Sequence, residues 1–422
     1  MNKKTHIPEI RFKNYRDKWE EKTLKDLSNS IEYGLNSSAT YYDGVHKYIR
    51  ITDIDDNSRK FISEKVTSPD IEFTPELENF KLQKNDLLFA RTGASVGKTY
   101  LYEEKDGEMY YAGFLIRARI KEDVSADFIF QQTLTEKYKQ FIAIASQRSG
   151  QPGVNGKEYG DWKLSAPSFQ EQSAIGSLFR TLDDLLASYQ GNLANYQSLK
   201  ATMLSKMFPK AGQTVPEIRL DGFEGEWEKV NLETSTIRLK SFSLPRDVET
   251  KENTGMRYIH YGDIHTGRAS YINNENVLPY ISKDLKITEF LKKGDLTFAD
   301  ASEDYKGIAE VSLLAVDPKD NVIAGLHTIA LRPNKNLDST FLYYLFKTQT
   351  FRKYGYKVGT GMKVFGISPT NLMKYEYYHP SLDEQQAIGT YFSNLDCLIA
   401  AYQEKFSQLE TLKKKFLQDM FI

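Results

Sequence analysis

The sequence is poor in cysteine and histidine and has no long hydrophobic run. Its one cysteine, Cys397, excludes an internal disulfide and a cysteine-rich zinc site and fits a reducing cytoplasm. Among the histidines only His260 and His265 are close in sequence, and no second cluster completes a metal site. No run approaches transmembrane length, and the N-terminus lacks the apolar core of a signal peptide. We therefore expect a cytoplasmic protein that binds no metal and spans no membrane.

Signatures of catalysis are also missing. The chain has no Asp/Asn-Pro-Pro-Tyr/Phe run of a methyltransferase and no convincing Gly-x-Gly cofactor loop after a strand. The stretch 93–99 looks like a phosphate-binding P-loop, but the motif needs four residues between its glycines, and Gly93 and Gly97 are closer than that. We predict a chain without catalytic residues and without a cofactor of its own. The alternative is an enzyme, a P-loop ATPase or a self-contained methyltransferase, and binding of ATP or S-adenosylmethionine by the isolated chain would support it.

The composition describes a globular chain of several domains. Its 422 residues suggest two or three domains, with 40% hydrophobic and 27% charged residues. The aromatic content of 13% suits either core filling or base stacking. A net charge of -1 means that a nucleic-acid reader would have to gather its lysines and arginines on one face.

The strongest feature present is an internal repeat. The stretch Pro167–Gln190 returns as Pro380–Gln403, with about 13 of 23 positions after the proline identical and an offset of about 213 residues. Each copy begins with a proline and a serine, followed three residues later by Glu171 or Glu384, which is a capping-box signature. Each copy therefore opens a helix.

Both helices carry an apolar stripe with a period of seven. In the first copy it runs through Ile175, Leu182, Tyr189, Tyr196 and Met203, and in the second through Ile388, Leu395, Tyr402, Leu409 and Phe416. A sustained stripe of this kind asks for a partner helix. At 1.5 Å per residue, about 40 residues give a rod of roughly 60 Å. Two core helices are the simpler interpretation, but two matched rods favour an antiparallel intramolecular coiled coil.

The repeat extends to the rest of each half. Residues 6–11 return at 214–219, 82–87 at 291–296, and Ala112-Gly113-Phe114 matches Ala324-Gly325-Leu326. Short runs at 48–51, 86–89, 114–120, 258–261, 296–299 and 328–331 predict strands, and 128–145 and 340–354 predict helices. The fold class is α+β: two duplicated α/β globules joined by two long helices in a pseudo-twofold arrangement. The predicted domains are 1–166, 167–208, 209–379 and 380–422.

Polar residues suited to DNA gather between the predicted elements. Arginine pairs with guanine, asparagine and glutamine with adenine, and lysine with phosphate. The candidates in the first half are Arg50, Arg91, Thr92, Gly93, Ser95, Lys98, Arg117, Gln147, Arg148, Gln151, Asn155 and Lys157. Those in the second half are His260, Ser302, Lys306, His327, Lys357, Thr360 and Lys363. Here Asp300 corresponds to Arg91, and His327 to the arginines at 117 and 119. Such changes are expected if the two halves recognise different DNA sequences, and they are also expected from neutral sequence drift.

The arrangement resembles the specificity subunit of type I restriction–modification systems. The resemblance is carried by the two Pro-Ser-x-x-Glu-Gln-x-Ala-Ile-Gly stretches at 167–176 and 380–389, by the Pro-Glu-Ile-Arg…Trp-Glu start of each half, and by the run from Asp86 to Lys98. It covers nearly the whole chain. The second half departs from the family pattern at the stretch that corresponds to 91–98.

The resemblance implies a non-catalytic subunit with two target-recognition domains. Each domain would read one half of a bipartite site in double-stranded DNA, and the helices would fix the spacing. The repeated helices would dock two adenine-N6 methyltransferase subunits, with Glu171, Gln172, Glu384 and Gln385 as partner-binding residues. S-adenosylmethionine belongs on those partners, and ATP and Mg on up to two restriction subunits. The alternative is a scaffold whose duplicated domains bind protein rather than DNA.

Overall fold

The chain folds into two compact units. The computed structural model describes residues 7–147, 151–282, 287–302, 307–361 and 365–422. Unit 1 comprises Met1–Gly191 and Gln403–Ile422, and unit 2 comprises Asn192–Tyr402. Each unit combines a globule with parts of two long helices, α4 (Phe169–Lys206) and α10 (Leu382–Asp419). Within the described ranges no helix is long and apolar enough to cross a membrane.

Unit 1 is built on an antiparallel sheet in the strand order β2-β9-β6-β7. Its strands are β2 (Ser28–Tyr33), β6 (Asp86–Ala90), β7 (Thr99–Leu101) and β9 (Leu115–Ile120). Three further pairs surround it: β1 (Glu20–Thr23) with β10 (Lys163–Ala166), β3 (Ala39–Tyr41) with β5 (Thr67–Pro69), and β4 (Lys47–Ile49) with β8 (Met109–Tyr111). Every residue of β6 is buried, so both faces of the central strand are covered.

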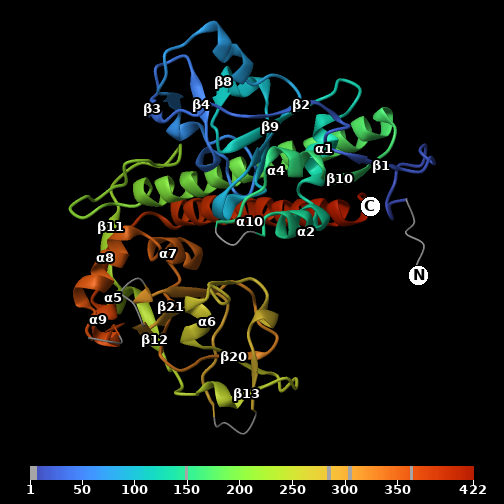
Figure 1. Ribbon diagram of the computed structural model, residues 1–422. Coiled ribbons are helices and arrows are strands. Elements are labelled where there is room, and N and C mark those ends of the chain that lie inside the picture. The colour runs from blue at the N-terminus through green and yellow to red at the C-terminus, as the bar shows by residue number, and fades with distance from the viewer. Residues whose placement is uncertain (1–6, 148–150, 283–286, 303–306, 362–364) are drawn as a thin grey trace. The chain divides into compact units, whose positions relative to one another are not determined.

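The helices of unit 1 pack on this sheet and on α4. They are α1 (Ala126–Gln132), α2 (Glu136–Ala145) and α3 (Gly156–Gly160). Figure 1 shows α1, β1 and β10 gathered near the start of α4, whereas β3, β4 and β8 lie together at the far end of the unit. The core joins Trp19 and Phe128 of the globule to Phe179 of α4 and Phe421 after α10.

Unit 2 repeats the plan with a larger sheet in the order β12-β21-β17-β19-β15. Its strands are β12 (Thr236–Leu239), β15 (Tyr271–Ile272), β17 (Leu296–Ala299), β19 (Val311–Leu314) and β21 (Thr328–Pro333). A second sheet holds β13 (Glu249–Thr250), β16 (Tyr280–Ile281), β14 (Met256–Ile259) and β20 (Asn321–Ala324). Two pairs complete the unit: β11 (Glu228–Asn231) with β23 (Glu376–His379), and β18 (Ala301–Ser302) with β22 (Phe365–Gly366).

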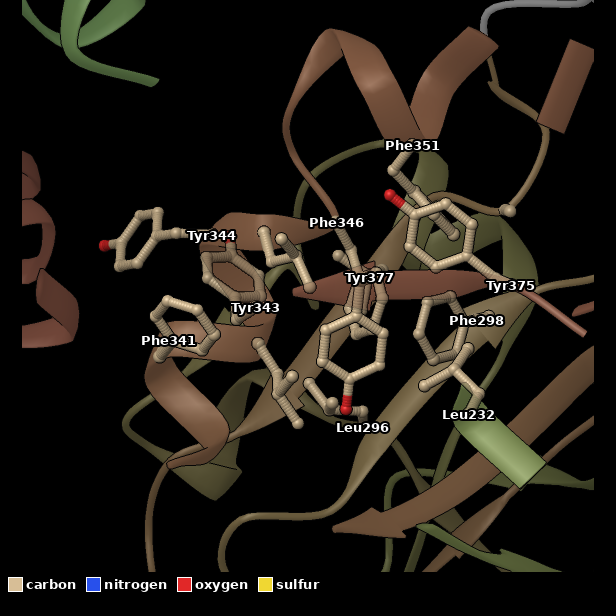
Figure 2. Close-up of a cluster of buried hydrophobic side chains, with 14 of the residues drawn as sticks. Leu232, Leu296, Phe298, Phe341, Tyr343, Tyr344, Phe346, Phe351, Tyr375 and Tyr377 are labelled. Atoms are coloured by element: carbon tan, nitrogen blue, oxygen red, sulfur yellow. The ribbon is translucent and has the colours of Figure 1, made fainter. Parts of the chain in front are cut away.

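The core of unit 2 is rich in aromatic rings. Its helices are α5 (Leu232–Ser235), α6 (Tyr261–His265), α7 (Ser339–Leu345), α8 (Gln349–Val358) and α9 (Pro369–Met373). Figure 2 shows rings from α7 and α8 meeting rings from the strands, and Phe351 lies 4.8 Å from both Phe346 and Tyr375 between ring centroids. Much of the high aromatic content of this half therefore fills a core.

Two of the predicted helices were wrong in extent. The single helix predicted over 128–145 is α1 followed by α2, and that predicted over 340–354 is α7 followed by α8. In each case a threonine, Thr135 or Thr348, accepts a hydrogen bond from the backbone three residues on and starts a new helix. The same side chain donates to the end of the preceding helix, at Gln132 or Leu345. Local capping thus outweighs the continuous apolar period.

Two predicted strands end early. The run 48–51 ends as β4 at Ile49, because Arg50 and Asp53 form a capping box around a 3-10 turn. The run 258–261 ends as β14 at Ile259, because His260 caps α6.

The long helices contact each other with opposite chain directions. In unit 1, Phe179 of α4 lies 6.5 Å from Phe416 of α10 between ring centroids, and Lys413 donates to Asp183 at 2.5 Å. In unit 2 the ring centroids of Tyr196 and Tyr402 are 5.2 Å apart, and Lys200 pairs with Asp396. Residue numbers rise along α4 as they fall along α10. The helices are antiparallel in both places.

Candidate nucleic-acid interface

The central sheet of unit 1 ends in a corner made by three chain segments. Strand β6 ends at Ala90, which pairs with Leu115 at the start of β9. Immediately beyond, the amide of Arg91 donates to the carbonyl of Phe114 at 3.1 Å, and the carbonyl of Arg91 accepts from Val154 at 2.9 Å. We use the name corner 1 for Arg91, Phe114 and Val154, which these two hydrogen bonds join, together with the side chains that contact them. Because both bonds are backbone bonds, the backbone of this corner is held by the sheet and by the loop before α3.

The side chains of corner 1 combine a cation with aromatic rings. The guanidinium of Arg91 lies 5.0 Å from the centroid of the Tyr33 ring. The hydroxyl of Tyr33 in turn accepts from the amide of Gly156 at 2.9 Å. Phe114 is 62% exposed, although it is a large apolar side chain. A cation–π contact of this kind holds an arginine in place while its N–H groups remain able to donate.

Unit 2 ends its central sheet in the same way. Ala299 of β17 pairs with Thr328 of β21, and the amide of Asp300 donates to the carbonyl of His327 at 3.0 Å. The carbonyl of Asp300 accepts from Ile367 at 2.9 Å. We call this corner 2. Its side chains differ completely from those of corner 1.

Corner 2 is acidic and histidine-containing. His327 Nδ1 lies 3.2 Å from Asp300 Oδ1, and half of the His327 side chain is exposed. The ring of Tyr261 meets that of His327 edge-on at 5.3 Å. Burial raises the pKa of the Asp300 carboxyl group, and the neighbouring His327 opposes the shift. Perturbed carboxyl groups of this kind are typical of functional sites.

The strand register corrects two matches made from the sequence. Asp86 pairs with Arg119 in unit 1 through both the strand register and an ion pair, and Asp295 forms the matching ion pair with Arg332 in unit 2. Counting from Ala299↔Thr328, His327 corresponds to Phe114 rather than to the arginines at 117 and 119. The match of Phe114 with Leu326 was likewise wrong, by one position. The Ala-Gly pair that aligned the two halves of the sequence is shifted by one residue relative to the strand register, so the residues next to it were matched one position out.

Five of the candidate DNA-binding residues are engaged inside the chain. Lys98 is buried, donates to the carbonyls of Ile51 and Ile54 and pairs with Asp56, and Arg117 is buried against Glu32 and the carbonyl of Asn79. Arg50 pairs with Asp53. His260 caps α6, and burial lowers the pKa of its imidazole. Ser302 is buried in β18. These contacts give each of the five a role within the fold.

The remaining described candidates reach the surface. Those that are exposed are Gln147, Gln151, Asn155, Lys157, His327, Lys357 and Thr360, and those that are half-buried are Arg91, Thr92, Gly93 and Ser95. Thr92 forms an isolated bridge with Gly153, which brings the loop carrying Gln151 to corner 1. Asn155 caps α3. Arg148, Lys306 and Lys363 lie outside the described residues.

The geometry excludes the P-loop interpretation. A P-loop runs from a strand through its glycines into a helix whose N-terminus holds the phosphates. Here the glycines join β6 to β7, its antiparallel neighbour in the sheet. Lys98, the residue that would reach a phosphate, instead points inward. In the described parts of the chain, no three His, Cys, Asp or Glu side chains are placed to hold a metal ion.

The four predicted partner-binding residues lie inside their own units. Glu171 forms a two-point ion pair with Arg11, with both bonds at 2.7 Å, and Glu384 does the same with Arg219 at 2.7 and 2.6 Å. Gln172 bridges the amide of Ser125, at the start of α1, to the carbonyl of Pro167. All four are at least 96% buried. Their role in the structure is to tie the start of each long helix to its globule.

Gln385 repeats this bridge in unit 2, between the amide of Asp338 and the carbonyl of Pro380. The glycine of the repeated stretch has a related role. A Cβ on Gly176 would lie 2.8 Å from Asp127 Cβ and 3.2 Å from the amide of Phe128. The repeated Glu-Gln…Gly pattern is thus explained by the packing of α4 and α10 on α1 and α7.

Sequence reasoning missed Phe114, Tyr33 and Tyr261. Aromatic residues next to strands are usually core residues, and the composition could not separate core filling from surface stacking. Only the exposure of Phe114 and the ring contacts of Tyr33 and Tyr261 single them out.

The fold and the paired corners define a duplicated α/β protein. The sequence profile of the type I restriction modification DNA specificity domain matches it twice, over residues 16–195 and 225–411. The chain therefore belongs to the type I restriction–modification specificity family. The predicted resemblance is confirmed, as is the mixed α/β fold with two such domains.

Named relatives agree with this assignment. A putative type I restriction enzyme MjaX specificity subunit from Methanocaldococcus jannaschii is 24% identical over 426 residues, which cover 98% of this chain and 94% of that protein. The MjaVIII specificity subunit of the same organism is 22% identical over 341 residues, covering 80% and 78%. A solved S subunit from M. genitalium shares the fold with a TM-score of 0.62 at 15% identity, over 99% of both chains. Specificity subunits are the non-catalytic components of these systems, so the prediction of a non-enzyme is also confirmed.

Proposed function

We propose that each unit reads one half of a bipartite site in double-stranded DNA. The observation that carries this proposal is the pair of corners. The two units place the same backbone hydrogen bonds at the end of the same sheet, yet the side chains there are Arg91 and Phe114 in one and Asp300 and His327 in the other. A fixed frame with different polar groups is what two readers of different sequences require. The reader domains are residues 1–166 and 209–379.

The helices α4 and α10 form an antiparallel coiled coil that sets the distance between the half-sites. Support comes from the ring and ion-pair contacts between them in both units, and from the apolar period of seven in both helices. The duplicated halves are related by a pseudo-twofold axis. Because the helices hold the two reader domains at one fixed distance, the two half-sites are read at one fixed distance along the DNA, as in other two-part DNA readers.

The same helices dock two methyltransferase subunits, one per half. Exposed leucines supply the contact surface, since exposed large apolar side chains on a helix mark interaction sites when they recur in a pattern. Unit 1 carries Leu185 of α4 and Leu412 of α10, and unit 2 carries Leu398 of α10 and Leu199 of α4. Leu398 and Leu412 follow Leu185 and Leu199 by the repeat offset, so each unit presents an equivalent pair. S-adenosylmethionine is bound by these partners, and ATP and Mg by restriction subunits that join them.

Methylation mapping tests the reader function. The chain is co-expressed with its methyltransferase in a host without adenine methylation, and modified adenines are mapped. We expect a split motif, one half of which changes when residues 1–166 are exchanged for the corresponding domain of another family member. Unmodified DNA despite a stable complex would favour the protein-binding scaffold.

A second experiment tests the docking surface. Leu185→Glu and Leu398→Glu should each reduce the bound methyltransferase from two copies to one in native mass spectrometry, because each removes one of two equivalent contacts. The single cysteine Cys397 is exposed beside Leu398, so its alkylation rate reports that surface directly. We expect the partner to protect Cys397 in the wild type and in Leu185→Glu but not in Leu398→Glu. Two bound copies in both variants would contradict the proposed surface.

A further inference from the structure

We propose that two positions in each corner determine which bases that unit reads. In unit 1 they are Arg91 and Phe114, and in unit 2 they are Asp300 and His327. This inference rests on the proposed function and deepens it, because it names the side chains that distinguish one half-site from the other. One of the four, Phe114, is not among the residues that the sequence put forward as contacts.

The two corners hold their side chains on equivalent backbone frames. Each position is held by one backbone bond across the sheet end, from Arg91 to Phe114 at 3.1 Å and from Asp300 to His327 at 3.0 Å. A second bond anchors the residue after the central strand to the loop before α3 or α9, at 2.9 Å in both units. A side chain on such a frame keeps its direction, so replacing it changes the chemistry offered without moving the backbone.

Phe114 and Arg91 lie outside the packed core of unit 1. Phe114 leaves 62% of its surface in solvent and does not belong to any apolar cluster of the described residues. The guanidinium of Arg91 is held over the ring of Tyr33. An aromatic ring beside an oriented guanidinium suits the edge of a base pair, where a methyl group and hydrogen-bond acceptors lie next to each other.

The backbone of His327 is strained. Its φ is 53°, a left-handed conformation that is unfavourable for a residue with a side chain. A glycine would relieve this, yet the position carries an imidazole that is half exposed and paired with Asp300. Strain of this kind together with a half-buried carboxyl group points to a selected surface function.

The chemistry of each pair indicates the bases. Arginine donates to O6 and N7 of guanine, and an exposed phenyl ring contacts the methyl group of thymine, so the half-site of unit 1 contains guanine next to thymine. A carboxylate accepts from the N4 amino group of cytosine. The half-site of unit 2 therefore contains cytosine at the position of Asp300, with His327 orienting that carboxylate.

The test uses the complete complex with its methyltransferase and maps methylated adenines, as above. The variants are Arg91→Ala, Phe114→Ala, Asp300→Asn and His327→Ala. The control is Ile237→Ala, which removes an exposed apolar side chain where β12 pairs with Arg332, at the opposite end of the sheet from corner 2. We expect Arg91→Ala and Phe114→Ala to relax only the half-site of unit 1, and Asp300→Asn and His327→Ala only the other.

The expected size is a loss of discrimination at one base of about 5- to 150-fold for Arg91→Ala and Asp300→Asn. Ile237→Ala should leave both half-sites unchanged. A wild-type split motif that all four variants reproduce unaltered would overturn the inference while leaving the proposed function standing. If the wild-type complex is stable but modifies nothing, the proposed function itself fails. Should an alanine variant not assemble, Arg91→Lys, which keeps the charge but removes the planar guanidinium, and the near-isosteric Asp300→Asn decide the same question.

Discussion

The ion pair between Arg11 and Glu171 should make the stability of unit 1 sensitive to the loss of Arg11, because the Glu171 carboxylate is buried. Arg11 lies in the leading segment of the chain and Glu171 in the first turn of α4, and two bonds of 2.7 Å join them. The Glu171 side chain is 1% exposed and that of Arg11 10%. Replacing Arg11 by Met keeps the aliphatic stem but leaves a carboxylate buried without its cation.

Two estimates give the size of this effect. Unit charges about 4 Å apart attract by about 4 kcal/mol at an effective dielectric constant of about 20. Removing one partner of a buried pair costs about 3–5 kcal/mol, because the remaining charge stays desolvated. Since Arg11 is slightly exposed, we expect about 3 kcal/mol for Arg11→Met. Adding Glu171→Gln should restore much of it, because no buried charge then remains.

The assay must separate the two units. Unfolding in urea is followed by hydrogen exchange, measured on peptides from the start of α4, which belongs to unit 1, and from the start of α10, which belongs to unit 2. The peptides that exchange faster identify the unit that has lost stability. Arg219→Met breaks the matching pair with Glu384 and should shift the loss to unit 2. Lys163→Met, which breaks an exposed pair with Glu21, is the control and should have a much smaller effect. A loss below about 1 kcal/mol for Arg11→Met would refute the reasoning about burial.

Three further variants test other contacts. Gly176→Ala should lower the melting temperature and reduce the free energy of unfolding by about 1–3 kcal/mol, because its Cβ would lie 2.8 Å from Asp127. Gly191→Ala in the same helix, with open space around it, should raise the free energy of unfolding by up to about 1 kcal/mol. Equal effects of the two substitutions would contradict the packing of Gly176 against Asp127. Gly97→Ala should cost more than about 1 kcal/mol, since its φ is 85° and its Cβ would lie 2.7 Å from Ile142, and an unchanged urea midpoint would speak against it. Asp300→Asn should gain stability relative to the wild type as pH rises above about 4. Burial raises the pKa of the Asp300 carboxyl group in the folded protein. The protonated carboxyl group therefore stabilises the folded wild type at a pH below the pKa of the unfolded chain. This stabilisation is lost as the pH rises through the pKa of the folded protein. A wild type that gains on the variant over this window would contradict that sign, and melting temperatures across a pH series provide the measurement.

The sequence alone carried the architecture a long way. The offset repeat identified a duplicated domain, and the period of seven identified two long helices, which the structure places at Phe169–Lys206 and Leu382–Asp419. These features are local and periodic, so they can be read without knowing which segments meet. The motif stretches also led to the right family, because several short patterns kept the same order in both halves.

The candidate site was much less accessible from sequence. Lys98 and Arg117 looked like contacts for DNA because of their charge, but the fold turns both inward, onto backbone carbonyls and a carboxylate. Glu171 looked available to a partner because it recurs, whereas it recurs because each helix must be tied to its own globule. Residue type gives the chemistry that a side chain can perform, but not the direction in which it points.

What the sequence by itself determined is therefore the duplication, the long helices and the family. Tertiary structure alone decided that Phe114 corresponds to His327, and it holds Arg91 and Asp300, which the sequence had already matched, at equivalent ends of their sheets. The physical reason is that strand register is set by hydrogen bonds between segments far apart in the chain. A shift of one residue turns a side chain to the other face of a sheet, and no local pattern records which register forms.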